Sequence, residues 1–404
     1  MIRDIRKYKV ILLFLIVYFS CNSFVLAIKF KSLSTTITIA VVLLVGMVSL
    51  IKGCNHISQS AWGLVLLSGL NILFTSFVNG YMNGYMLLFL ELLLALACIR
   101  LYTRREFLES YIFVMKLLAV YAIVIGIINA TMPSLLNVFT TYISSNREIY
   151  YDAIFAFQLA STQRINSIWG EPGMLSVFLI FAIAFECFYV DRPINYFTFT
   201  VLTLAEVLTF SSAGYVCLAL IMAATLVSAN RGSNERKVAS IMLVACIILY
   251  FAIENVAWMQ TMIQGSVNKL TNSDDIAFIG RLAPILYNIQ EGVKSLFWGN
   301  GIEGQAFYVD FSFYSGMMYC NTSTTTYLFN AFGIIISSIS VYLTWKLLKL
   351  TKQRGLLFRI LLFIVLILNV NAQAVHIDQV YWIILFLPFM WNSEQCDEYY
   401  EQYE

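Results

Sequence analysis

Arg164 and Glu171 stand in the segment RINSIWGEPG, directly before a long apolar run. Pro172 suits the first position of a helix, whose N–H has no partner within the helix, so we expect a helix to begin there. A helix N-terminus beside an arginine suits an anionic ligand such as phosphate. Glu171 could then orient or deprotonate an acceptor hydroxyl. The alternative is a plain helix start with an exposed arginine.

A second segment, GRLAPILYNIQEGVKSLFWGNGIEG, carries Arg281 as its second residue. Its apolar residues follow helical spacing, and Gly299 and Gly301 then end the pattern, which predicts an amphipathic helix lying on the membrane face. Arg281 falls outside the apolar stripe and is a second candidate for binding an anion. The simpler alternative is an interfacial helix with ordinary solvated charges.

A third group, His376 and Asp378, lies in the connection NAQAVHIDQVYW near the C-terminus. Histidine has an unperturbed pKa of about 6.5 and is a common general base. We rank both residues behind Glu171 as the base, because a histidine at a helix end is more often only an interfacial residue.

The composition excludes several classes of protein. Of the 404 residues, 60% are hydrophobic and 12% are charged, whereas soluble domains are about 45–50% apolar and about 25% charged. The chain is therefore expected to be a single integral membrane domain over residues 1–404. No basic stripe points to nucleic acid. The 8 cysteines are scattered and only 2 histidines exist, so we predict neither a disulfide framework nor a metal site, and no cofactor.

Apolar segments of about 20 residues predict about twelve transmembrane helices. The basic N-terminal segment without a cleavage site predicts a retained first span, and the Lys and Arg residues of the short connections predict cytoplasmic N- and C-termini. Two long loops, 131–172 and 255–324, then lie outside and are expected to carry the chemistry. Glu91 and Lys116 are expected to form an ion pair within the membrane. The predicted spans start near Val10, Leu33, Ile57, Met82, Phe107, Gly173, Asn195, Ala213, Val238, Thr325, Leu356 and Gln379.

These loops resemble those of the O-antigen polymerase/ligase superfamily, most closely the Wzy-type polysaccharide polymerases. RINSIWGEPGMLSVFLIF resembles the Arg-x-x-Ser-x-x-x-Glu-Pro-x motif of that family, and TFSSAGYVCLALI resembles its Ser-Ser-x-Gly turn. Arg281 and Gly292 fit its Arg-x10-Gly spacing, whereas Arg164 does not. The resemblance covers roughly Arg164 to the last span.

The resemblance implies an all-α, polytopic, GT-C-like fold in the bacterial inner (cytoplasmic) membrane. It also implies polymerisation of undecaprenyl-diphosphate-linked repeat units into O-antigen or a related surface polysaccharide, on the outer face of that membrane. The partners would be these lipid-linked glycans, membrane lipids and a chain-length regulator. Arg164 and Arg281 would bind the diphosphate without a metal, Gly292 and Asn300 would contribute to substrate binding, and Glu171, or else His376 or Asp378, would be the base.

Two alternatives remain open. A flippase or transporter for lipid-linked oligosaccharides would also have about twelve spans, but we find no internal repeat. An O-antigen ligase would carry a histidine late in the second long loop, where this chain reads MMYCNTSTTTYLF. The sequence therefore favours the polymerase.

Overall fold

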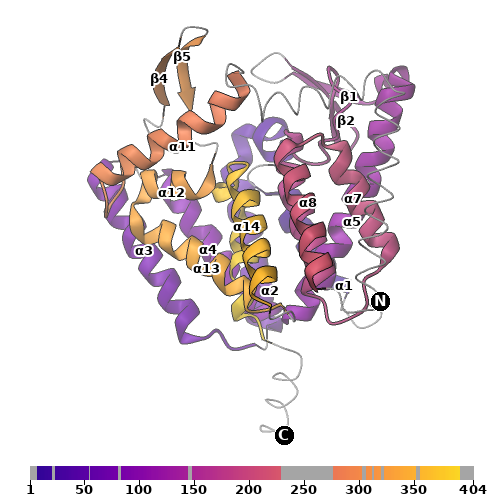
Figure 1. Ribbon diagram of the computed structural model, residues 1–404. Coiled ribbons are helices and arrows are strands. Elements are labelled where there is room, and N and C mark those ends of the chain that lie inside the picture. The colour runs from indigo at the N-terminus through magenta and orange to yellow at the C-terminus, as the bar shows by residue number, and fades with distance from the viewer. Residues whose placement is uncertain are drawn as a thin grey trace, which may run out of the picture.

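The structure is a computed structural model of the full chain, and most of the residues that it describes are helical. Three of the described helical segments, Lys31–Lys52, Gln59–Asn79 and Arg104–Thr131, are long and apolar enough to cross a membrane. Several shorter apolar helices pack beside them (Figure 1). The described residues are 7–20, 23–53, 55–80, 83–143, 148–228, 276–302, 306–311, 314–319, 323–351 and 355–391.

The helices start within about three residues of eleven of the predicted positions, as expected for strongly apolar segments. The predicted span near Val238 lies outside the described residues, and the number twelve stays a prediction. The first half of the chain forms α1 (Lys7–Tyr18), α2 (Ser34–Lys52), α3 (Gln59–Asn79), α4 (Asn83–Leu101) and α5 (Arg104–Thr131). The second half forms α6 (Pro172–Phe188), α7 (Tyr196–Leu208), α8 (Ser212–Ser228), α11 (Ile276–Lys294), α12 (Thr324–Phe332), α13 (Ile334–Leu348), α14 (Leu356–Asn371) and α15 (Gln379–Leu385).

Successive helices run up and down, so the connections gather at two opposite rims of the bundle. At the loop rim, where α7 and α14 end and α12 begins, Thr324 Oγ1 donates to the carbonyl of Gln373 (2.8 Å). At the opposite, basic rim, where α5 begins, the amide of Arg104 donates to the carbonyl of Trp391 (2.8 Å). The α11 helix and all the described strands lie at the loop rim (Figure 1).

The loop rim corrects the prediction of an all-α chain. The loop after α5 contains a 3-10 helix, Pro133–Val138, and an antiparallel sheet in the order β1-β2-β3. The second long loop contains an antiparallel pair, β4 and β5. Because these segments lack the helical spacing of α11, their backbone groups pair between strands instead. The strands are β1 (Thr140–Ile143), β2 (Ile149–Asp152), β3 (Phe157–Leu159), β4 (Ala306–Phe311) and β5 (Tyr314–Tyr319).

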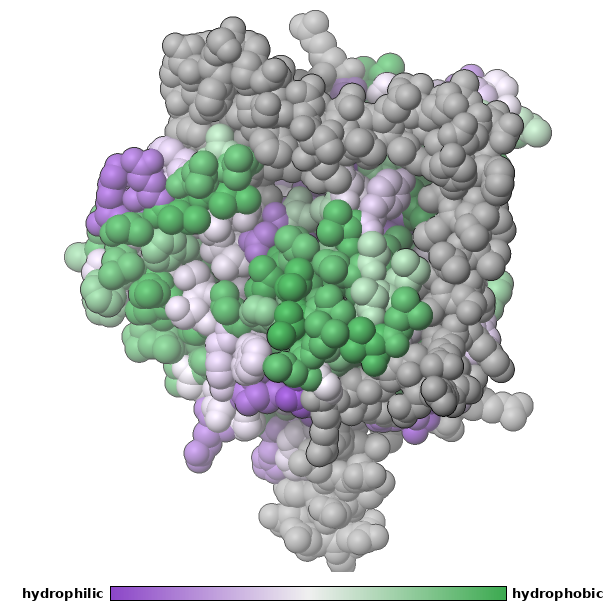
Figure 2. Space-filling model, in the orientation of Figure 1, coloured by the Kyte–Doolittle hydropathy of each residue, from purple (hydrophilic) through white to green (hydrophobic). Residues whose placement is uncertain are grey.

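An apolar surface surrounds the bundle between the rims. The α6 helix is central, with nearly all of its side chains buried, whereas α2, α3, α5 and α14 each expose large apolar side chains on one face. Figure 2 shows such residues covering the middle of one side of the molecule. A face that exposes leucine and phenylalanine over whole helices is stable in lipid and not in water. These features are those of a helical membrane protein.

A backbone contact between two glycine corners joins α11 to the bundle. The predicted span near Thr325 is broken at Gly333 (φ 74°, ψ −165°) into α12 and α13, a conformation that is essentially restricted to glycine. Gly299 and Gly301 have φ of 66° and 82°. Across the contact the amide of Asn300 donates to the carbonyl of Asn330 (2.7 Å), and the amide of Ile334 donates to the carbonyl of Leu296 (2.8 Å).

Gly333→Ala tests this contact. A Cβ at Gly333 would meet the backbone of Phe297 at 2.5 Å, and the strained conformation alone costs about 1–3 kcal/mol. We expect a lower heat-unfolding midpoint in detergent. The matched control is Gly63→Ala on α3, where nothing lies within 4 Å of the added Cβ and alanine should stabilise the helix by about 0.5–1 kcal/mol. Equal midpoints for the two variants would contradict the role of the corner.

Candidate functional site

Arg164 lies half-buried at the loop rim against the end of α7. Its Nε donates to the carbonyl of Thr209 (2.8 Å), the residue that caps the C-terminus of α7. The adjoining backbone is fixed as well, since the carbonyl of Arg164 accepts a hydrogen bond from Gln158 Nε2 (2.9 Å). A cation at the negative end of a helix dipole is favoured. The loop therefore holds this guanidinium in a defined place.

Glu171 is the N-cap residue of α6, and Pro172 is the first residue of the helix, as the sequence predicts. The side chain of Glu171 makes no capping hydrogen bond and is exposed at the loop rim. An exposed carboxylate beside the positive end of the α6 dipole can accept a proton from a hydroxyl group that approaches from outside. Arg164 and Glu171 belong to one short segment, which the loop holds at the rim.

Trp169 anchors this segment from inside. It is fully buried, and its ring stacks on Phe178 of α6 with centroids 4.8 Å apart. The amide of Phe24 donates to the carbonyl of Ile168 (2.7 Å), and Ser23 and Trp169 form a β-bridge. The tryptophan is thus a packing residue, and it sets the position of Gly170 and Glu171 next to it.

Asp378 lies beneath Trp169 and is fully buried as the N-cap of α15, with Oδ1 accepting from the amide of Val380 (2.9 Å). Burial raises the pKa of its carboxyl to about 7, and the hydrogen bond from the Val380 amide, with the polar groups of Ser20 and Trp169 nearby, opposes that rise. No solvent reaches this carboxyl in the structure, and its hydrogen bond fixes the start of α15.

His376 is also buried, and its ring stacks on Tyr327 of α12 with centroids 4.1 Å apart. Burial lowers the pKa of the imidazole to about 3, so the ring is neutral at physiological pH. With Leu87, Leu88 and Glu91 it lines a cavity of about 30 Å³, large enough for one or two water molecules.

Glu91, in the same region, does not have the partner that the sequence predicts. The expected Glu91–Lys116 ion pair is not among the salt bridges of the described residues. Lys116 Nζ lies 5.2 Å from the centroid of the Phe113 ring instead. The α4 helix packs on α2, α3 and α15, and not as a hairpin with α5, so Glu91 faces His376. The sequence did indicate that Glu91 needs a partner inside the bundle, because a carboxylate within an apolar segment is costly unless it is paired.

The residues of the second long loop form a separate group. Gly292 is buried, and a Cβ there would meet the ring of Phe329 at 2.5 Å, so this glycine lets α11 approach α12. Asn300 Nδ2 donates to Asn330 Oδ1 (2.8 Å) and to the carbonyl of Glu291 (3.1 Å). Both residues hold α11 in place. Arg281 lies on α11, but its side chain is outside the described residues.

The predicted site residues thus fall into two groups at one rim. Arg164, Glu171 and Asp378 are linked through the Trp169 segment, whereas Gly292 and Asn300 are linked through α12. His376 stacks on α12 and stands between them. Their roles in catalysis and substrate binding stay predictions.

Glu206 is a buried carboxyl that the sequence did not rank among the site residues. Its Oε1 accepts from Ser176 Oγ of α6 (2.6 Å). A Cβ at Gly214 of α8 would collide with both of these side chains, which gives a packing reason for the glycine in TFSSAGY. Glu206 lies on the last turn of α7, which leads to Thr209, the partner of Arg164. Its hydrogen bond to Ser176 therefore fixes the end of α7 that holds Arg164.

Metal chemistry has no preformed site in the part of the chain that the structure describes, because no three His, Cys, Asp or Glu side chains cluster there.

Comparisons with known proteins give no match: no family model, no curated protein and no solved structure is significantly similar to this chain. The class of protein that the fold defines is a helical membrane protein with its polar loops gathered at one rim.

Asp378→Asn should change how stability depends on pH. The folded-state pKa of about 7 lies above the ordinary value of 3.8 for an aspartate, so the neutral carboxyl stabilises the folded protein at low pH, and this contribution is lost as the pH rises through about 7. Wild type should therefore lose about 1.4 kcal/mol per pH unit relative to the asparagine variant between about pH 4 and 7. Heat-unfolding midpoints measured from pH 4 to 8 provide the check. The shift of His376 is common to both proteins and cancels, so parallel curves would contradict the prediction.

Proposed function

We propose that this protein is a membrane glycosyltransferase that polymerises undecaprenyl-diphosphate-linked repeat units into O-antigen or a related surface polysaccharide. The observation that carries the proposal is the segment Arg164–Pro172, which presents a fixed guanidinium and an exposed carboxylate at the rim where both long loops lie. The resemblance of the same segment to the Wzy-type polymerases supports it. On this proposal the loop rim faces outward from the bacterial inner membrane, both termini are cytoplasmic, and a chain-length regulator is the protein partner.

Each residue then has a defined role. The acceptor hydroxyl oxygen attacks the anomeric carbon of the donor saccharide, its proton passes to Glu171, and the bond from that carbon to the diphosphate oxygen breaks. Arg164 and Arg281 stabilise the negative charge that develops on the diphosphate, since arginine binds phosphate bidentately and stays charged. Glu171 is a better base than His376 or Asp378 because it alone of the three is exposed.

Arg164→Ala should abolish chain extension, because the leaving group loses its cation, and Arg281→Ala should do the same. Lysine at either position should restore only part of the activity, since it cannot bind two oxygens in the same plane. The readout is the length of lipid-linked glycan in cells that express each variant at equal membrane abundance. Arg105→Ala is the matched control, since Arg105 pairs with Glu109 (3.0 Å) at the basic rim. Full-length chains from Arg164→Ala would overturn the assignment.

Glu171→Gln should slow extension by about 10²–10⁴-fold, the usual contribution of a general base. The amide keeps the shape of the side chain, and α6 begins without a capping hydrogen bond from Glu171, so the start of α6 should be unchanged. The rates are measured across pH with purified lipid-linked donor. The variant should lose the part of the pH dependence that comes from deprotonation of Glu171. An unchanged rate would exclude Glu171 and leave the base unassigned.

Deletion of the gene separates the three functional classes. A polymerase predicts single repeat units on the lipid core and no ladder. Long lipid-linked chains that never reach the core would identify a ligase, and single units trapped on the cytoplasmic side would identify a flippase. Either of the last two results would sink the proposal.

A further inference from the structure

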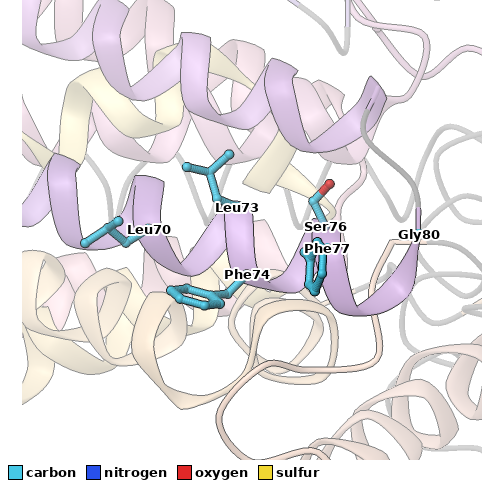
Figure 3. Close-up of a pocket in the computed structure, with 6 residues that line it drawn as sticks. All are labelled: Leu70, Leu73, Phe74, Ser76, Phe77 and Gly80. Atoms are coloured by element: carbon cyan, nitrogen blue, oxygen red, sulfur yellow. The ribbon is translucent and has the colours of Figure 1, made fainter.

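The outward face of α3 carries an apolar groove at the loop rim. The groove has a volume of about 720 Å³ and is lined by Leu70, Leu73, Phe74, Ser76, Phe77 and Gly80. Figure 3 shows that all six belong to the last turns of α3 and to the residue that caps it. Phe77 is 87% exposed, and nothing lies within 4 Å of a Cβ built on Gly80, so the groove is open at its outer end.

The segment that follows α11 packs against the same part of α3. Asn71 Nδ2 and Thr75 Oγ1, on the inward face of α3, donate to the carbonyls of Phe297 (3.2 Å) and Trp298 (2.8 Å). The ring of Trp298 lies 5.1 Å from that of Phe74. The rings of Phe297 and Trp298 are themselves exposed, so apolar surface continues from α3 onto the end of α11.

The bilayer is the environment that covers this surface. The α3 helix is one of the three described segments long enough to cross a membrane, and the groove continues its exposed apolar face. The exposed stripe of α11 extends the same surface along the rim, as expected for a helix in the interface. The stripe consists of Leu282, Leu286, Ile289 and Val293.

We propose that this groove binds one acyl chain of a phospholipid, from the leaflet at the loop rim, as a fixed lipid. The six lining residues that the structure describes carry no charged side chain, so this wall of the groove suits a hydrocarbon tail and not a headgroup. We assign the groove to a phospholipid and not to the lipid-linked substrate because the groove and Arg164 lie on different helices. The α3 helix packs on α4, α12 and α13, whereas Arg164 contacts the end of α7. Arg281 lies on the neighbouring α11, and the competition experiment below tests that side.

The test is native mass spectrometry of the delipidated, full-length protein titrated with dioleoyl-phosphatidylethanolamine. We expect one tightly bound lipid, and about tenfold weaker binding to the Leu73→Ala/Phe77→Ala variant, a difference of about 1.4 kcal/mol. The control is Leu43→Ala/Leu50→Ala on the lipid-facing side of α2, which removes similar exposed apolar groups and should bind as wild type does. Equal weakening in both variants, or no retained lipid in wild type, would overturn the proposal.

Two further measurements complete the test. Leu70→Trp narrows the groove without removing apolar surface, so it should also weaken binding, even if the double alanine variant fails to fold. Polyisoprenyl phosphate added as a competitor should not displace the phospholipid, and displacement at equal concentration would assign the groove to an isoprenoid chain instead. The outcome does not depend on glycan polymerisation, so it can fail or succeed separately from the proposed function.

Discussion

The absence of water around the bundle is the constraint on which the rest of this structure depends. A backbone amide or carbonyl without a partner in hydrocarbon is costly, so the chain can cross only as helices, and irregular backbone has to gather at the ends. The break between α12 and α13 illustrates the rule. The carbonyls and amides near Gly333 are paired with those of the turn at Gly299–Gly301, across a contact so close that neither corner has room for a side chain.

The same constraint decides where polar side chains can act. Many of the buried ones bond to backbone that helix ends leave unpaired, as Arg164 does with Thr209 and Asn55 with Tyr102. Other polar side chains, such as Asp378 and His376, carry ionisable groups whose charged form is disfavoured by burial. Among the three candidates for the general base, these two are buried and Glu171 is exposed.

Support for the loop rim comes from segments far apart in the sequence. Phe24 pairs with Ile168, Lys29 binds Asp152 at 2.6 Å, and Asp378 closes the corner beneath Trp169. These contacts tie the start of the chain, the first long loop and the last connection to one another. They give the Arg164–Pro172 segment a fixed geometry, which a site for charge stabilisation requires.

The sequence by itself determined the membrane class, the starts of most of the helices and the helix start at Pro172, because apolar runs and proline act locally. It also predicted the amphipathic α11 and its glycine end. It could not show that the long loops contain strands, since strand pairing depends on partners that local spacing does not reveal. Nor could it place Glu91 against His376, or Asp378 beneath Trp169. Burial and the pairing of distant segments are properties of the packed bundle, and they alone decide which ionisable group is exposed and which is enclosed.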